Sequence, residues 1–262
     1  MIWKAALPMY NLSDRLALAH QALLTALAEE AGQAIDLESP SDLPDFWRRE
    51  DVLISQTCGY PYMTQLRGRV MLVATPCYDF AGCSGSDYSS VIVVRDGGGI
   101  DALADAAGTT AAFNDPHSNS GMNVLRHAVA PLARGGRFFG AVIQSGSHAA
   151  SVRMVRDGTA DIAAIDCVTY GYLAQENPEA VAGLRVQGRS APSPGLPLIA
   201  GGGVPEEVVL RLRDALLRPS TRLLERMRAL RIVAFEYRTD ADYGRILELE
   251  ADARAAGYPK LS

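Results

Sequence analysis

The sequence has few of the residues that mark several large classes of protein. It contains only 4 cysteines, and no two of them form a C-x-x-C pair, which argues against a zinc module. A disulfide from Cys83 to Cys58 or Cys77 remains open, as does a reactive thiol at Cys58 or Cys167. No apolar run approaches the roughly 20 residues that span a bilayer, so we expect no membrane insertion.

Positive charge is also scarce. The chain has 25 lysines and arginines against 30 acidic residues, which gives a net charge of -5 and a pI of about 5.4. Because a nucleic-acid partner requires a basic face, and the arginines here are scattered, we expect no nucleic-acid binding. The sequence reveals no metal-ligand cluster and no coupled nucleophile–base pair, so it predicts no catalytic residues, no metal and no cofactor.

The amino terminus lacks the pattern of a secretory signal. Residues 1–7 (MIWKAAL) resemble a first core strand and have neither a long apolar stretch nor a small-residue cleavage site. We therefore expect the chain, as encoded here, to remain in the cytoplasm unless a leader has been removed.

What the sequence does contain is an alternation of short apolar strands with helical patterns. At 262 residues and 48% hydrophobic composition, it can form one large domain or two smaller ones. Ser13 or Asp14 can cap a helix through Ala31 that carries an apolar stripe of leucines. The strands expected after the first are residues 35–38, 52–55, 70–75, 90–94, 109–113, 139–143, 161–165, 184–187 and 196–200.

This alternation predicts an α/β protein with predominantly parallel sheets. From Pro205 onwards the pattern is mostly helical, over residues 206–217, 221–230 and 240–255. Residues 96–99 (DGGG) and 191–195 (APSPG) are the best linker candidates.

The segment 114–121 (NDPHSNSG) carries the clearest functional signal. It connects a predicted strand to a predicted helix, and a helix start offers unpaired N–H groups and partial positive charge to an anion. The segment has no lysine and is not rich in glycine, so it is not a nucleotide P-loop. The alternative is that Ser118 or Ser120 only caps the helix.

Three other predicted strands also end in polar or aromatic residues. They run into residues 56–61 (QTCGYP), 145–148 (SGSH) and 166–167 (DC). In open α/β sheets, ligands bind beyond the carboxyl ends of the strands. We therefore expect these ends to face one cleft.

Six segments in this order resemble the phosphate/phosphite/phosphonate-binding components of ABC importers. The resemblance runs from about Leu7 to Pro205 and continues more weakly to the end of the chain. The segments are residues 55–61 (SQTCGYP), 87–94 (DYSSVIVV), 114–116 (NDP), 118–121 (SNSG), 146–148 (GSH) and 161–166 (DIAAID).

The resemblance implies an α/β, two-lobed type II periplasmic-binding-protein fold with two crossover strands. On this basis lobe 1 is discontinuous and comprises residues 1–90 and 195–262, whereas lobe 2 comprises residues 91–194, with a ligand cleft between them. The location implied by the family is periplasmic.

The resemblance also implies the site residues. Tyr60 and Tyr88 match tyrosines of the family's cleft, Ser118, Asn119, Ser120 and Gly121 match its hydroxyl-rich helix start, and His148 matches its phosphonate-contacting histidine. Asp166 matches an acid that holds an amine on the ligand. The sequence departs from the family at Asn119, where phosphonate binders often have threonine.

Each of these assignments has a structural alternative. The serines would only cap a helix, the tyrosines would be half-buried core residues, and His148 would be a surface residue. Asp166 would cap the helix that begins near Val168.

The function expected from this resemblance is that of a solute-binding protein. It would bind phosphate, phosphite or a phosphonate by lobe closure, as the binding component of an ABC importer with a permease partner. The alternative is a cytoplasmic enzyme or sensor that reuses the periplasmic-binding-protein fold, since some enzymes of menaquinone and thiamin-precursor biosynthesis share it.

Overall fold

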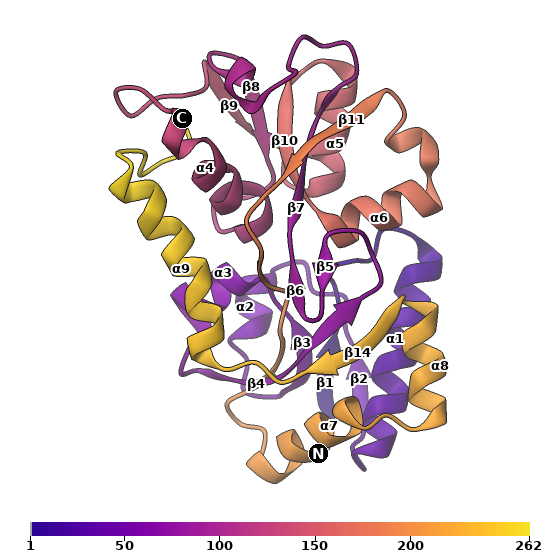
Figure 1. Cartoon of the computed structure of the whole chain (residues 1–262). Coiled ribbons are helices and arrows are strands. Elements are labelled where there is room, and N and C mark those ends of the chain that lie inside the picture. Colours follow the sequence, from indigo (N-terminus) through magenta and orange to yellow (C-terminus); the bar gives the residue numbers. More distant parts are fainter. Residues whose placement is uncertain (1) are drawn as a thin grey trace. The chain divides into compact units, whose positions relative to one another are not determined.

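The computed structural model of the protein describes residues 2–262, and the chain forms two compact units (Figure 1). Unit 1 comprises the chain up to Asp79, Cys83–Asp87 and Pro194–Tyr243. Unit 2 comprises Phe80–Gly82, Tyr88–Ser193 and Gly244–Ser262. Residues 244–262, which were expected in lobe 1, therefore group with unit 2. Met1, the first residue of the expected first strand, lies outside the described residues.

Unit 1 contains a six-stranded mixed sheet with the order β14-β4-β13-β3-β1-β2. Strand β1 pairs in parallel with β2 and β3, whereas β13 and β14 both run antiparallel to β4. Its strands are β1 (Trp3–Ala6), β2 (Ile35–Leu37), β3 (Val52–Gln56), β4 (Val70–Tyr78), β13 (Leu198–Gly201) and β14 (Ile232–Glu236).

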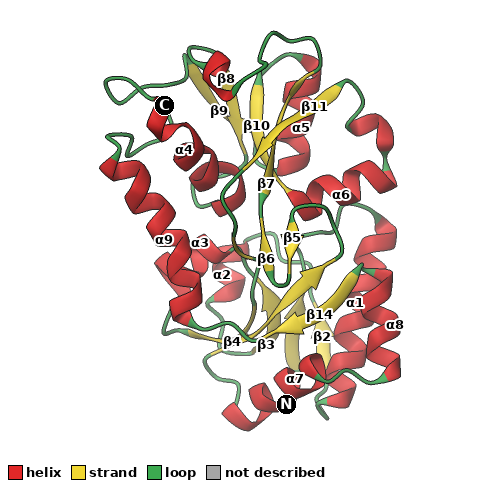
Figure 2. Cartoon of the chain, viewed as in Figure 1, coloured by secondary structure: helices red, strands yellow, loops and turns green. Residues whose placement is uncertain are grey.

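The helices of unit 1 follow the sequence patterns closely. Ser13 caps α1 (Asp14–Glu30) by accepting a hydrogen bond from the backbone N–H of Leu16, and the expected leucine stripe of this helix is buried. Helix α1 packs beside α8 (Thr221–Ala229) (Figure 2). The other helical segments are α2 (Leu43–Trp47), α3 (Gly59–Pro61), η1 (Tyr62–Leu66) and α7 (Glu206–Leu217).

Three two-residue strands form a separate small sheet in the order β12-β6-β5. They are β5 (Cys83–Ser84), β6 (Asp87–Tyr88) and β12 (Ser193–Pro194). Apart from Phe80–Gly82, which group with unit 2, the chain passes from unit 1 to unit 2 within β6 and returns within β12. It changes unit again after Tyr243, inside helix α9 (Asp240–Ala255).

Unit 2 contains a five-stranded mixed sheet with the order β11-β7-β10-β8-β9. Strand β10 is parallel to β8 and antiparallel to β7. The strands are β7 (Ser90–Arg95), β8 (Thr110–Phe113), β9 (Ala141–Gln144), β10 (Ile162–Asp166) and β11 (Leu184–Arg189). The helical segments are η2 (Leu103–Ala106), η3 (Asn119–Asn123), α4 (Val124–Val129), η4 (Ala130–Leu132), α5 (His148–Asp157), α6 (Cys167–Glu176) and η5 (Pro178–Ala180).

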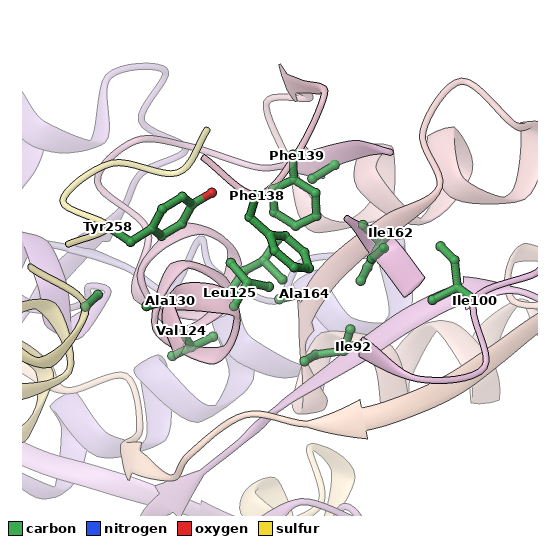
Figure 3. Packing of buried hydrophobic residues seen from close by; sticks show 14 of the residues in the cluster. Ile92, Ile100, Val124, Leu125, Ala130, Phe138, Phe139, Ile162, Ala164 and Tyr258 are labelled. Carbon is green, nitrogen blue, oxygen red and sulfur yellow. The ribbon is translucent and has the colours of Figure 1, made fainter. Parts of the chain in front are cut away.

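One hydrophobic cluster joins the sheet of unit 2 to the end of the chain (Figure 3). Leu125 of α4 and Ile162 of β10 are fully buried in it, and Phe138 meets Phe139 edge to face at 4.8 Å. Tyr258 and two residues of α9 belong to the same cluster. Burial of each large apolar side chain contributes about 1.5–3 kcal/mol, so this cluster explains why the end of the chain groups with unit 2.

The structure corrects three expectations about the strands and sheets. Both large sheets are mixed rather than predominantly parallel. Strand β14 lies in the part of the chain that was expected to be mostly helical, and it forms an edge of the unit 1 sheet. The strand expected from residue 139 starts at Ala141 as β9, and the N–H groups of Phe138 and Phe139 donate instead to the carbonyl of Ser262 at 3.0 Å.

Candidate functional site

The loop after β8 ends in a π-helical turn. Ser118 is the N-cap of η3, and its Oγ accepts a hydrogen bond from the N–H of Gly121 at 3.0 Å. The N–H of Asn123 donates to the carbonyl of Ser118, five residues back, at 3.1 Å. Such wide turns often occur at functional sites. Ser118 and Ser120 are both largely buried, with exposures of 5% and 4%.

Gly121 is required at this turn by close packing. A Cβ added to Gly121 would lie 1.8 Å from Oδ1 of Asn114 and 3.2 Å from Cε1 of His148. The backbone of η3 therefore approaches the ends of two other segments, the loop after β8 and the start of α5. Asn114, Gly121 and His148 meet at this point.

His148 connects the start of α5 to the start of η3 by a hydrogen bond. It is the first residue of α5, which Ser147 caps by accepting from the N–H of Ala150 at 3.1 Å. Its Nε2 lies 2.8 Å from Oγ of Ser120, in a hydrogen bond whose direction depends on the imidazole tautomer. This contact places a serine hydroxyl next to an imidazole, two residue types for which the sequence predicted no catalytic pairing.

Two buried polar atoms beside Gly121 have no hydrogen-bond partner in the described part of the chain. They are Nδ1 of His148 and Oδ1 of Asn114. Most buried polar groups in folded proteins are hydrogen-bonded, so atoms of this kind call for a ligand or an ordered water. They mark the meeting point of Asn114, Gly121 and His148 as a candidate ligand-binding point.

The candidate site has the character of a neutral donor cluster. Burial lowers the pKa of His148 to about 4, and the nearby carbonyl of Ala164 offsets this only in part. The imidazole is therefore uncharged near pH 7, with one donor and one acceptor nitrogen. An anion at this site would be held by hydroxyl, imidazole and backbone N–H dipoles.

Tyr88 and Asn119 lie in the same unit and contact each other. Asn119 is 0% exposed, and its Nδ2 donates to Oη of Tyr88 at 3.3 Å and to Oγ of Ser193 at 2.9 Å. Its Oδ1 accepts from Nδ2 of Asn123 at 3.0 Å. Both ends of the Asn119 amide are thus engaged within the protein.

Asp166 adopts the capping role that the sequence left open. Its Oδ1 accepts from the N–H groups of Val168 at 2.8 Å and Thr169 at 3.1 Å, which caps α6. The residue is 2% exposed. Tyr60 belongs to unit 1, where it is half-buried in α3 and its carbonyl accepts from the hydroxyl of Thr64 at 2.8 Å.

Sequence reasoning missed several residues that build this region. Asn114 was noted only as part of the loop, although its position directly after a strand was an available signal. Ser90 donates to the carbonyl of Ser120 at 2.8 Å, and Ser193 binds Asn119. No local signal identified Ser90 or Ser193, because each acts on a residue at least 30 positions away in the sequence.

The cysteines and acidic residues offer little other chemistry. All four cysteines are thiols, and burial, together with the nearby Glu236, raises the pKa of Cys77 to about 12. Within residues 2–262, the His, Cys, Asp and Glu side chains nowhere gather in a group of three that could hold a metal. Among the same residues, no helix is both long and apolar enough to cross a membrane.

Comparison with known proteins gives a family match over most of the chain. The profile of a family described as "ABC transporter, phosphonate, periplasmic substrate-binding protein" matches residues 5–243. A search of curated proteins finds no match.

Solved structures resemble the chain over nearly its whole length. A binding protein component of an ABC phosphonate transporter from Pseudomonas aeruginosa has a TM-score of 0.82 at 20% identity, covering 98% of this chain and 87% of that chain. PhnD1 from Prochlorococcus marinus, in complex with methylphosphonate, has a TM-score of 0.80 at 16% identity, with 97% and 98% covered. XAC2383 from Xanthomonas citri, bound to ATP, has a TM-score of 0.70 at 18% identity, with 98% of each chain covered. These likenesses show the type II periplasmic-binding-protein fold.

Proposed function

Because the chain belongs to the family of periplasmic substrate-binding proteins of phosphonate ABC transporters, we propose that it binds a small phosphonate-like or phosphate-like oxyanion and delivers it to an ABC permease. The family is one of transport proteins and not of enzymes, and membership agrees with the resemblance found in the sequence.

The observation that supports an oxyanion ligand most strongly is the donor cluster beside Gly121. Ser118 accepts from the N–H of Gly121, so its own O–H proton remains available for a ligand oxygen. Nδ1 of His148 makes no hydrogen bond of normal geometry in the described chain, and the Cε1 atom of the same imidazole lies beside this turn. Hydroxyl and N–H dipoles fixed in place before binding suit tetrahedral oxygens.

We place the ligand among small oxyanions rather than aminoalkyl phosphonates. An amine on the ligand would need an acid held for it, and Asp166, the acid expected in this role, is 2% exposed and caps α6 through Oδ1. The similar PhnD1 was solved with methylphosphonate, a ligand without an amine. Phosphate, phosphite and methylphosphonate are the first ligands to test.

Calorimetry of the purified protein with these ligands tests the proposal. We expect binding by the parent and weaker binding after Ser120→Ala or His148→Asn, because each lost hydrogen bond to a charged group costs about 1.5–3 kcal/mol. The matched control is Ser13→Ala, which removes a serine cap of the same kind from α1 in unit 1. No binding by the parent, or equal affinity in all variants, would contradict the assignment.

The contact between Ser120 and His148 raises the question of an esterase-like enzyme, which we regard as the second candidate. In hydrolases of this type, a third group orients the histidine through its other nitrogen. Here no carboxylate or other side chain bonds Nδ1 of His148 in the described chain, only the Ala164 carbonyl lies nearby, and a pKa of about 4 makes the imidazole a weak base. We propose that Ser120 and His148 bind the ligand and do not catalyse its conversion. The phosphorus NMR spectrum of the ligand should therefore be unchanged after long incubation with the protein.

A further inference from the structure

A directed chain of hydrogen bonds runs through the turn formed by Ser118 and η3 in unit 2, which we call the oxyanion turn. It starts at Arg126 of α4, which is 4% exposed and can only donate hydrogen bonds. Its Nη2 donates to Oδ1 of Asn123 at 2.6 Å, and its Nη1 donates to the carbonyl of Pro259 at 2.9 Å. The carboxylate of Glu250, which also binds Arg254 at 2.7 Å, lies 3.8 Å from Nη2 of Arg126.

The donor at Arg126 determines the orientation of both amides that follow. Since Oδ1 of Asn123 faces the guanidinium, its Nδ2 faces the carbonyl of Ile246 and Oδ1 of Asn119, at 3.0 Å each. Since Oδ1 of Asn119 accepts there, its Nδ2 faces the hydroxyls of Tyr88 and Ser193. The carbonyl of Ile246 can only accept, so it supports the same order.

The chain ends on two hydroxyls that are forced to accept. Each hydroxyl has a single proton, and a hydroxyl that accepts from Asn119 keeps that proton for another acceptor. Tyr88 and Ser193 are also the first and last residues of the long middle segment of unit 2. The side chain of Asn119 therefore contacts both ends of that segment.

We propose that Asn119 is a positioning residue that orients the hydroxyls of Tyr88 and Ser193 as donors for the bound oxyanion, and that Ser193 is a further ligand-recognition residue. This rests on the proposed oxyanion site. Asn119 itself does not contact the ligand, because it is 0% exposed and its two N–H groups and its carbonyl oxygen are all used. The role explains why an amide stands between the two serines.

We call the hydrogen bonds that run from Arg126 through Asn123 and Asn119 to the hydroxyls of Tyr88 and Ser193 the relay. It predicts how the effects of substitutions on ligand affinity depend on one another. Asn119→Leu has nearly the same shape but can neither donate nor accept, so the two hydroxyls lose the group that orients them. We expect the affinity for methylphosphonate to fall at least tenfold. Ser193→Ala and Tyr88→Phe each remove one of the oriented donors and should weaken binding by a similar factor.

A double-mutant cycle, read by calorimetry, separates this role from a purely structural one. In a Tyr88→Phe/Ser193→Ala background there are no hydroxyls to orient, so Asn119→Leu should then change the affinity less than twofold. An equal fold loss in both backgrounds, or no loss in the parent background, would overturn the relay. Thermal unfolding of the ligand-free variants shows which of them are folded.

A second substitution and a charge control complete the experiment. If Asn119→Leu does not fold, Asn119→Ser replaces it, since it keeps a small polar group but cannot reach both hydroxyls. Asn119→Asp converts the donor into an acceptor and should abolish binding, whereas Asn177→Asp adds the same charge at an exposed site of unit 2 and should change the affinity less than twofold.

The outcomes distinguish the relay from the proposed function. If the parent binds methylphosphonate and Ser120→Ala weakens binding while the cycle shows no coupling, only the relay is wrong. If the parent binds none of the three oxyanions, the proposed function fails and the relay fails with it.

Discussion

At Gly121 a single methyl group would occupy space that Asn114 already fills. Gly121→Ala should displace the Asn114 side chain and distort the oxyanion turn, at a cost of about 1–3 kcal/mol in unfolding free energy and with a loss of ligand affinity. Chemical denaturation and calorimetry measure the two effects.

Gly244→Ala is the matched control for this substitution. Gly244 lies in helix α9, and a Cβ there meets nothing within 4 Å. Since alanine favours a helix over glycine, the control should stabilise the protein by about 0.5–1 kcal/mol. A destabilised control together with a stable Gly121→Ala would show that the packing argument is wrong.

Two histidines should make the protein sensitive to acid. Burial lowers the pKa of both His20 and His148 from 6.5 to about 4. Between these values the unfolded chain binds more protons than the folded one, so stability falls as the pH falls from 6.5 towards 4. Each histidine contributes a slope of up to about 1.4 kcal/mol per pH unit.

Urea denaturation at several pH values tests this prediction. His148→Gln should flatten the dependence of the unfolding free energy on pH across this range, and His20→Gln should do the same. The control, Asn177→Gln, changes an exposed residue that does not titrate and should leave the slope as in the parent. Parallel slopes in all variants would contradict the assignment to the two buried histidines.

Among the elements, the start of α9 depends on one tyrosine hydroxyl. Oη of Tyr243 donates to the carbonyl of Gly195 at 2.9 Å and lies 2.8 Å from Oγ1 of Thr75, and the residue is fully buried in unit 1. Burial also raises its pKa. These bonds connect the first turn of α9 to β4 and to the segment before β13.

Tyr243→Phe should lower the unfolding free energy by about 1–3 kcal/mol, because it leaves the Gly195 carbonyl and the Thr75 hydroxyl without this partner. The ring keeps its edge contact with Tyr62, so packing is preserved. Thermal unfolding compares it with Tyr237→Phe, where the side chain is exposed and the change should be within 0.5 kcal/mol, roughly the range of ordinary surface substitutions. Equal losses of stability in the two variants would show that the Tyr243 hydroxyl does not stabilise the start of α9.

For the whole molecule, we propose that ligand binding draws the two lobes together, as the family resemblance implies. A ligand shifts a conformational equilibrium only if it binds one state more tightly, and groups from two lobes can be satisfied together only when the lobes are closed. Small-angle X-ray scattering should show a smaller radius of gyration with saturating methylphosphonate. As a control, the Ser120→Ala variant is measured at a methylphosphonate concentration too low to saturate it, and it should scatter like the ligand-free parent. An unchanged radius of gyration in the ligand-bound parent would contradict closure.

Most helices and strands could be predicted because their signals are local. The cap at Ser13, the leucine stripe of α1 and the bounds of α7 and α9 depend on residues within a few positions of one another. The strand-to-helix turn with Ser118 and Ser120 was visible for the same reason. The order of these segments also carried the family resemblance, which the match over residues 5–243 confirms.

Contacts between distant parts of the chain could not be predicted in this way. The strand directions, the edge strand β14 and the grouping of residues 244–262 with unit 2 depend on which apolar faces pack together. The same holds for the bonds of Asn119, since Tyr88 and Ser193 lie 31 and 74 positions from it. Local pattern encodes where each element begins, whereas packing and long-range hydrogen bonds determine which side chains remain available to a ligand.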